Sequence, residues 1–187
     1  MNKSYQQKLV RISQKYILLL AICLSFSFSF ERAFASDVSE NNVVTLINHE
    51  RMIRNIKPLK IDSDLDWAAN LKSKDMLNRN YFDHFALGLT PWDFIHISGY
   101  NYSLAGENLA MDFNTSEGMV QAWMNSPKHR DNILNPDFED IGLGIVKGTF
   151  IEETDQRQTT MVTNLFGRKQ TRFAAFVDKL VKGLFTF

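Results

Sequence analysis

Cysteine is almost absent from this chain of 187 residues. The single one, Cys23, lies within an apolar run near the N-terminus, and the bulky Ile22 before it does not suit a lipid-attachment site. Residues 36–187 therefore contain neither a disulfide nor a thiol nucleophile, and a domain formed by them must depend on a packed core. The chain also lacks the HExxH motif of metalloproteases and the GxSxG motif of α/β-hydrolases, so no motif assigns a catalytic residue.

A net charge is absent as well, because 21 basic side chains balance 21 acidic ones. The charges are nevertheless unevenly distributed along the chain. Residues 36–167 carry eleven basic and nineteen acidic side chains, a net charge of −8, whereas residues 168–187 carry a net charge of +4. An acidic body does not offer the positive surface that a phosphate backbone requires. We therefore expect no nucleic-acid partner, and no nucleotide cofactor.

The first 35 residues have the three parts of a secretory signal peptide. Basic side chains precede an uncharged run from Tyr16 to Phe30, and a small-x-small sequence follows at Ala33-Phe34-Ala35. The uncharged run is shorter than the roughly 20 residues of a comfortable membrane span. We expect cleavage after Ala35 and export to the periplasm or the cell exterior, with an uncleaved anchor as the alternative.

Residues 36–41 are interpreted as a linker, and residues 42–167 as one domain large enough to bury its own core. Apolar periodicity predicts three helices in its first half, over residues 40–55, 63–80 and 90–99. The second of these has a capping-box-like start at Ser63 and Asp66. The third begins at Thr90-Pro91 and ends at Gly99, a cap followed by proline and closed by glycine.

The second half of the domain is rich in β-prone residues. Three short runs have this character, over residues 141–146, 149–152 and 159–166. The polar segment 153–158 is expected to turn the last two runs into a hairpin, while residues 104–111 fit either a strand or a loop. Helices followed by clustered strands predict an α+β fold with an antiparallel sheet.

Two further short helices are predicted around residues 116–134. Trp123 belongs to an apolar stripe and is expected in the core, with Met119, Val120 and Met124. Pro127 ends the first helix and, after the cap Ser126, opens the second. This arrangement holds Glu117 in the first turn of one helix and His129 in the first turn of the next.

A second pair of proton-binding side chains lies upstream. His84 follows two aromatic residues in a break between helices, and Glu107 precedes Asn108, whose amide we expect to serve the backbone. The remaining histidines, His49 and His96, are interpreted as surface or packing residues. Trp67 and Trp92 are likewise expected to pack in the core rather than to bind a ligand.

Six blocks in this order resemble the cysteine-rich secretory/antigen 5/pathogenesis-related-1 (CAP) superfamily, also called the SCP domain, in its cysteine-poor secreted bacterial form: NHERM (48–52), YFDH (81–84), GEN (106–108), WMNSPKHRDNIL (123–134), IGLG (141–144) and NLFG (164–167). The resemblance implies a three-layer α-β-α sandwich with a central antiparallel sheet. It also implies a cleft with two histidines and two glutamates. The matching positions here are His84, Glu107, Glu117 and His129. The disulfides and signature segments of eukaryotic members are missing, so we do not expect sterol binding.

Two imidazoles and two carboxylates suit a divalent cation such as zinc. His84 and His129 would be its ligands, while Glu107 and Glu117 would either coordinate the ion or orient the histidines. Three alternatives stay open. The tetrad could support metal-dependent hydrolysis, the domain could be a non-catalytic interaction module for a protein or cell-envelope partner, or the tetrad could be purely structural. We expect a monomer.

The last segment, residues 168–187, extends past the family pattern. Its apolar residues follow helical spacing, and its net charge is +4: Phe173, Phe176, Val177, Leu180, Val181 and Leu184 form the stripe. This predicts a basic amphipathic helix, which would either dock on the acidic body or lie peripherally on an anionic membrane.

Overall fold

The computed structural model describes residues 37–152 and 155–171. The predicted signal peptide lies outside the described residues, as does most of the predicted C-terminal helix. Arg168 and Lys169, which were assigned to that helix, instead end a strand. Within the described ranges, no helix is long and apolar enough to cross a membrane.

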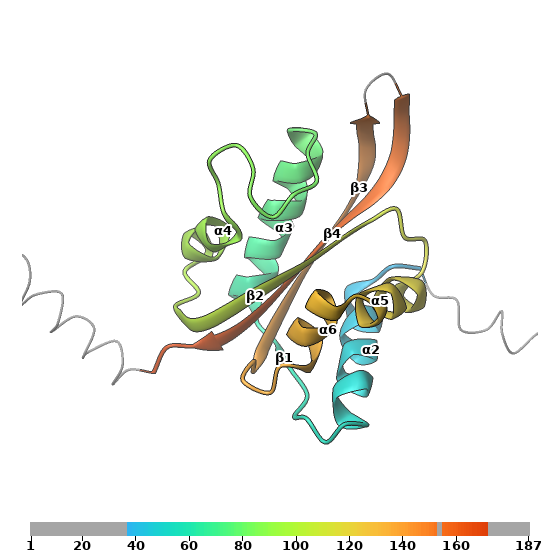
Figure 1. Cartoon of the computed structure of the whole chain (residues 1–187). Coiled ribbons are helices and arrows are strands. Elements are labelled where there is room, and N and C mark those ends of the chain that lie inside the picture. Colours follow the sequence, from blue (N-terminus) through green and yellow to red (C-terminus); the bar gives the residue numbers. More distant parts are fainter. Residues whose placement is uncertain (1–36, 153–154, 172–187) are drawn as a thin grey trace, which may run out of the picture. The chain divides into compact units, whose positions relative to one another are not determined.

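Five helices and four strands make up the described part of the chain (Figure 1). The helices are α2 (Glu40–Met52), α3 (Ser63–Asn78), α4 (Pro91–Ser98), α5 (Ser116–Asn125) and α6 (Pro127–Leu134). The strands are β1 (Lys60–Ile61), β2 (Tyr102–Met111), β3 (Asp140–Glu152) and β4 (Asp155–Lys169).

The strands form one sheet in the order β1-β3-β4-β2. The pairs β3–β4 and β2–β4 are antiparallel, whereas β1 pairs with the start of β3 in parallel through two residues. In Figure 1, α3 and α4 lie on one side of the sheet, and α2, α5 and α6 lie on the other. The predicted three-layer α-β-α sandwich is therefore confirmed, with β1 as a short parallel addition that the sequence did not reveal.

The strand predictions need correction in their bounds. Residues 104–111 belong to a strand, which decides between the two alternatives for that segment. The runs 141–146 and 149–152 are one continuous strand, β3, and the hairpin joins it to β4 with Glu152 opposite Asp155. Most of the polar segment 153–158, predicted as a turn, is thus strand, because each added pair extends the backbone ladder regardless of side-chain polarity.

Helix α3 lies closely against β3 because the facing strand residues are glycines. A Cβ added to Gly142 would lie 2.2 Å from the carbonyl carbon of Leu65, and one added to Gly144 would lie 2.2 Å from that of Ala69. The IGLG block therefore has a packing role: it lets the helix backbone approach the strand backbone. This contact fixes the position of α3 relative to the sheet.

The helix starts follow the expected chemistry with one correction. The predicted start of α4 at Thr90 is a capping box formed by the side chains of Thr90 and Asp93, and Gly99 ends the helix as predicted, with a φ of 84°. The cap of α3 is Asp62 rather than Ser63, because its carboxylate accepts from the backbone N–H groups of Asp64 and Leu65. The predicted partner in that cap, Asp66, instead accepts from the N–H of Leu143 at 2.8 Å and ties α3 to β3.

The NHERM block ties α2 to the loops around it. The guanidinium of Arg51 is fully buried and donates to four backbone carbonyls, those of Lys57, Ile133, Asn135 and Phe138. The amide of Asn48 bonds both backbone groups of Leu59, at 2.7 and 3.0 Å. Both side chains satisfy backbone groups of loops, and Arg51 also satisfies the carbonyl of Ile133 in the last turn of α6, so they support the fold.

Candidate functional site

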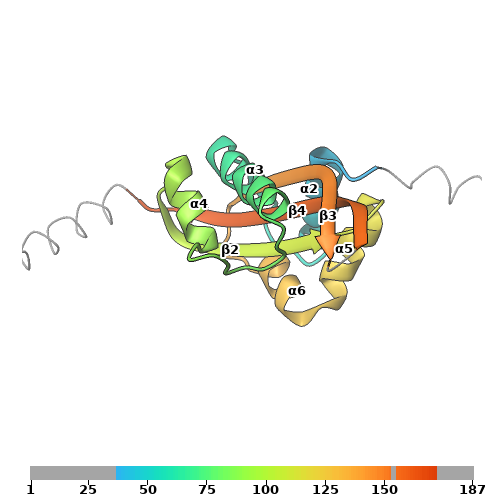
Figure 2. The same ribbon diagram turned by 90° about the horizontal axis from the view of Figure 1, so that it is seen from above.

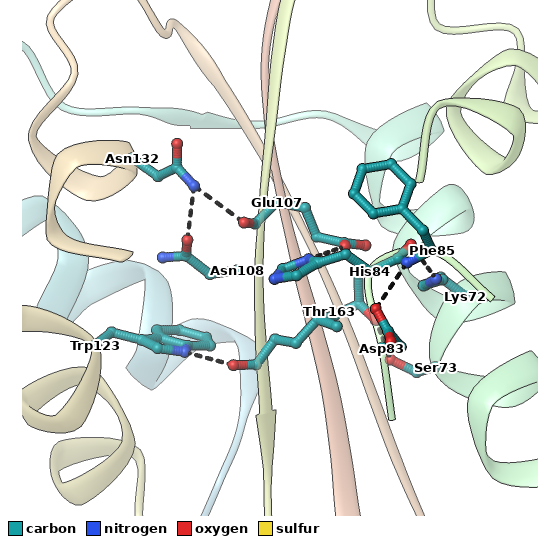
Figure 3. A network of polar contacts seen from close by, with 11 residues as sticks. Lys72, Ser73, Asp83, His84, Phe85, Glu107, Asn108, Trp123, Asn132 and Thr163 are labelled. Carbon is teal, nitrogen blue, oxygen red and sulfur yellow. Dashed lines mark hydrogen bonds and ion pairs between the residues drawn. The ribbon is translucent and has the colours of Figure 1, made fainter. Parts of the chain in front are cut away.

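The site is centred on His84 and Glu107. His84 lies in the loop between α3 and α4, and Glu107 lies on β2. The imidazole Nδ1 and the carboxylate Oε1 are 2.6 Å apart, the length of a charge-assisted hydrogen bond (Figure 3). The His84 side chain is 42 % exposed, whereas that of Glu107 is 2 % exposed. The pair therefore presents an imidazole to solvent and holds it with a buried carboxylate.

Burial acts on the ionisation of Glu107. Desolvation raises the pKa of Glu107, while the hydrogen bond from His84 and the charge of Lys72 act against that rise. Its second oxygen, Oε2, is buried and has no hydrogen-bond partner among the described residues. A buried carboxylate oxygen without a partner is costly, and such groups concentrate at sites used for binding or catalysis.

Lys72, on α3, is a member of this site that the sequence analysis missed. Its ammonium Nζ donates to the backbone carbonyl of His84 at 3.0 Å, although the residue is fully buried (Figure 3). A sequence signal was present, because Lys72 falls on the helical spacing of the apolar residues that α3 buries: Leu65, Ala68, Ala69 and Met76.

His129 is held on the far side of β2 by a second network. The side-chain amide of Asn108 donates to the backbone carbonyl of His129 at 3.0 Å. Asn132 in turn donates to the Asn108 side-chain oxygen at 2.8 Å and to the Glu107 backbone carbonyl at 3.0 Å (Figure 3). The amide of Asn108 was expected to turn to the backbone beside Glu107, but it bonds the backbone of the second histidine instead.

The two histidines interact electrostatically. Burial lowers the pKa of His129, and the nearby charge of His84 lowers it further. Of the four predicted residues, His84 and Glu107 are in direct contact, while the convergence of the whole tetrad stays a prediction.

The other predicted residues lie on α5 and at the start of α6. Glu117 is in the first turn of α5 and half-buried, and its membership of the tetrad stays a prediction. Trp123 is 2 % exposed and donates from Nε1 to the carbonyl of Leu109 at 2.9 Å. Pro127 is the first residue of α6, as predicted. By contrast, Trp67 is 50 % exposed, so its predicted place in the core is wrong.

The described side chains do not form a ready-made metal site. Among residues 37–152 and 155–171, no three His, Cys, Asp or Glu side chains gather closely enough to hold a metal ion. Zinc sites use three or four protein ligands, so His84 and Glu107 alone do not make one. The bond from Nδ1 to Glu107 leaves Nε2 of His84 as the nitrogen that could bind an ion. Since the arrangement does not fit a metal ion as it stands, we derive no chemistry through one, and cation binding stays a prediction.

Two cavities lie elsewhere on the described surface. One, of about 460 Å³, is lined by the loops that Arg51 holds: Asn55, Ile56, Lys57, Pro58, Lys60, Pro136, Phe138, Glu139 and Asp140. The other, of about 380 Å³, is lined by polar residues: Asp37, Asp112, Asn114, Lys147, Gln158, Thr159 and Thr160. Neither lining includes a residue of the predicted tetrad.

Comparison with protein families gives the identity of the domain. The model of the cysteine-rich secretory protein family, CAP, matches residues 44–159. The chain belongs to the CAP family. This confirms the resemblance drawn from the six sequence blocks.

This CAP domain is similar to several bacterial proteins. The uncharacterized protein YkwD of Bacillus subtilis is 48 % identical over 109 residues, which are 58 % of this chain and 42 % of YkwD. An extracellular protein of Bacillus anthracis that contains an SCP domain has a similar structure, with a TM-score of 0.59 and 31 % identity over 69 % of this chain and 40 % of its own. An outer surface protein of Borrelia burgdorferi shares the fold, with a TM-score of 0.58 and 23 % identity over 73 % of this chain and 100 % of its own. The chain spans less than half the length of YkwD and of the Bacillus anthracis protein.

Proposed function

We propose that this CAP-domain protein is an exported binding module whose ligand contacts the exposed side of His84. The observation that carries the proposal is the 2.6 Å bond between a half-exposed imidazole and a buried carboxylate. Because Glu107 engages Nδ1, the remaining hydrogen-bonding atom of the ring is Nε2. A fixed imidazole with one engaged nitrogen is a preorganised polar contact for a ligand.

Exposed apolar side chains flank His84 in the sequence of the same loop. Phe82, Phe85 and Leu87 are exposed by 40 %, 60 % and 58 %, and the ring centroid of Phe85 lies 6.4 Å from that of His84. Three large apolar side chains exposed within six residues are unusual for a monomeric surface and are typical of a binding site. We infer a ligand that combines an apolar group with a hydrogen-bonding group.

The backbone of the same loop supports a binding role. Ala86 and Leu89 exchange both backbone hydrogen bonds around a two-residue turn, in which Leu87 has a φ of 56° and Gly88 a φ of 78°. A bulky residue at positive φ is strained, at a cost of about 1–2 kcal/mol. The turn therefore exposes a leucine in spite of both its backbone conformation and its hydrophobicity.

Export is supported by the relatives and by the sequence. The Bacillus anthracis relative is described as extracellular and the Borrelia burgdorferi relative as an outer surface protein. The predicted signal peptide and the acidic charge of residues 36–167 agree with a secreted or periplasmic location. A partner in the cell envelope or outside the cell would then be within reach.

The proposal is tested with a library of capped dipeptides. Each dipeptide combines one apolar side chain with one hydrogen-bonding side chain. Binding to the purified protein is followed by ¹H–¹⁵N NMR. We expect members that shift resonances of residues 81–89, with Kd raised at least about 10-fold by His84→Ala and by Phe85→Ser. The matched controls are His96→Ala and Ile97→Ser, since Ile97 is 59 % exposed, as Phe85 is 60 % exposed.

The proposal fails if no dipeptide shifts residues 81–89, or if His84→Ala binds as the wild type does. Zn²⁺ alone is titrated in parallel. Saturable Zn²⁺ binding that both His84→Ala and His129→Ala abolish would favour the cation-binding prediction over a site for organic ligands.

Hydrolysis is a second candidate, and the same pair favours it. A carboxylate that orients an imidazole is the base-and-orienter arrangement of nucleophilic hydrolases. Glu107→Gln keeps the size of the side chain and removes its charge. If the purified protein hydrolyses a panel of chromogenic esters and peptides, Glu107→Gln is expected to reduce the rate by a factor of about 10²–10⁴. Rates that stay at the buffer background for the wild type exclude this candidate.

A further inference from the structure

We propose that Lys72 is a positioning residue, which fixes the backbone of His84 and supplies the counter-charge of Glu107. The inference rests on the proposed role of His84 in binding. It extends that role to a residue on another element, α3. Lys72 itself is fully buried and would not touch the ligand.

The first part of the inference is a backbone anchor. Nζ of Lys72 donates to the carbonyl oxygen of His84 at 3.0 Å. Helix α3 is itself fixed by the close contact of its backbone with Gly142 and Gly144 of β3. Because α3 is fixed against β3, the bond from Lys72 also fixes the backbone of His84, whose orientation the site requires.

The second part concerns charge. Within the described ranges, no carboxylate forms an ion pair with the Lys72 ammonium, which lies 5.2 Å from the ring centroid of Tyr81 and 5.4 Å from that of Phe94. Two aromatic rings stabilise a cation without neutralising it. The positive charge consequently remains available to act on Glu107, whose own oxygen Oε2 is buried without a partner.

A role in packing alone does not explain a buried lysine at position 72. A methionine would fill the same volume with no charge to desolvate, and burying an unpaired ammonium is costly. Burial lowers the pKa of Lys72, and the negative charges of Glu107, Asp75 and Asp83 oppose that shift. The acids thus favour the charged form of Lys72, and the positive charge of Lys72 favours the carboxylate form of Glu107 in turn.

Substitutions test this inference without any ligand, so its result is independent of whether the binding proposal holds. Lys72→Met removes the donor and the charge but keeps the volume, and Lys72→Gln keeps a donor only. Lys74→Met is the matched control, because Lys74 lies on the same helix and is exposed. The His84 tautomer is determined from ring ¹⁵N shifts at neutral pH, and backbone hydrogen exchange is measured for residues 82–88.

We expect a single His84 tautomer in the wild type and in Lys74→Met, and a mixture of tautomers in Lys72→Met. Exchange of amides 82–88 should accelerate at least about 10-fold in Lys72→Met and less in Lys72→Gln. A role limited to packing would leave the tautomer unchanged in Lys72→Met, and that result overturns the inference. If the variants do not fold, the side-chain ¹⁵N resonance of Lys72 is measured in the wild type instead. The proposal requires a charged ammonium whose protons exchange slowly. A neutral amine, or one whose protons exchange freely, refutes it.

Discussion

Replacement of Trp123 should be among the most destabilising single changes in this domain. The indole is 2 % exposed and lies where α5 meets the sheet. A buried tryptophan removes roughly 150–250 Å² from water, worth about 4–6 kcal/mol at about 25 cal/mol per Å². The alanine side chain still buries part of that area, so we expect Trp123→Ala to lower the free energy of unfolding by about 3–5 kcal/mol.

The indole also has a polar contribution that a second variant isolates. Its Nε1 donates to the backbone carbonyl of Leu109 at 2.9 Å, and Leu109 is itself buried. Trp123→Phe keeps most of the apolar area and leaves that carbonyl without a partner. We therefore expect Trp123→Phe to cost about 1–3 kcal/mol, clearly less than Trp123→Ala.

Urea denaturation followed by far-UV circular dichroism measures both effects. The matched control is Trp67→Ala, because Trp67 is 50 % exposed and should cost well under half as much as Trp123→Ala. The reasoning is refuted if Trp123→Ala unfolds at the wild-type midpoint with an unchanged slope. Equal losses for Trp123→Phe and Trp123→Ala would show that the hydrogen bond, rather than the buried area, dominates.

Two further predictions concern the α3–β3 contact and pH. Gly144→Ala should lower the free energy of unfolding by about 1–3 kcal/mol or more, because its Cβ would lie 2.2 Å from backbone atoms of Ala69. The control Gly148→Ala should lower it less, since the new Cβ would meet only the flexible end of the Leu77 side chain. Equal urea midpoints for the two variants would contradict this prediction. The pKa of His129 lies below its ordinary 6.5, so the unfolded chain binds the proton more tightly and stability falls as pH drops through 6.5 toward the lower folded-state pKa. Melting temperatures between about pH 7.5 and 5 should fall less in His129→Gln than in the wild type or in the control His49→Gln, and parallel curves for all three would exclude His129 as the cause.

Local chemistry made much of the fold predictable. Thr90, Pro91 and Gly99 are a cap, a first-turn proline and a positive-φ stop, and each acts over one helical turn, so the sequence alone places α4. Strand bounds were less predictable, because a polar residue enters a ladder whenever its partner across the hairpin does. The two-residue strand β1 carries no periodicity at all, and only its pairing with Asp140 and Ile141 defines it.

The candidate site was predictable only where a residue type points to chemistry. His84 and Glu107 were recognised from the family blocks, and the structure joins them directly. Lys72 and Arg51 were missed because a charged residue in a helix is ordinarily solvated, and nothing local shows that its partners are backbone carbonyls far along the chain. For Lys72 the helical spacing contained the signal, since a cation on an otherwise apolar stripe must be either exposed or bonded.

The two buried cations show how the domain divides support from recognition. Arg51 donates to four backbone carbonyls on the α2 side of the sheet, and these hydrogen bonds compensate its buried charge. Lys72 donates to one carbonyl, and its charge also interacts with Glu107, Asp75 and Asp83. A fully coordinated cation stabilises a scaffold, whereas an under-coordinated one costs stability and is retained where its charge is needed. The under-coordinated Lys72 on α3 and the strained turn at Leu87, between α3 and α4, both cost stability, and they flank the loop that exposes His84.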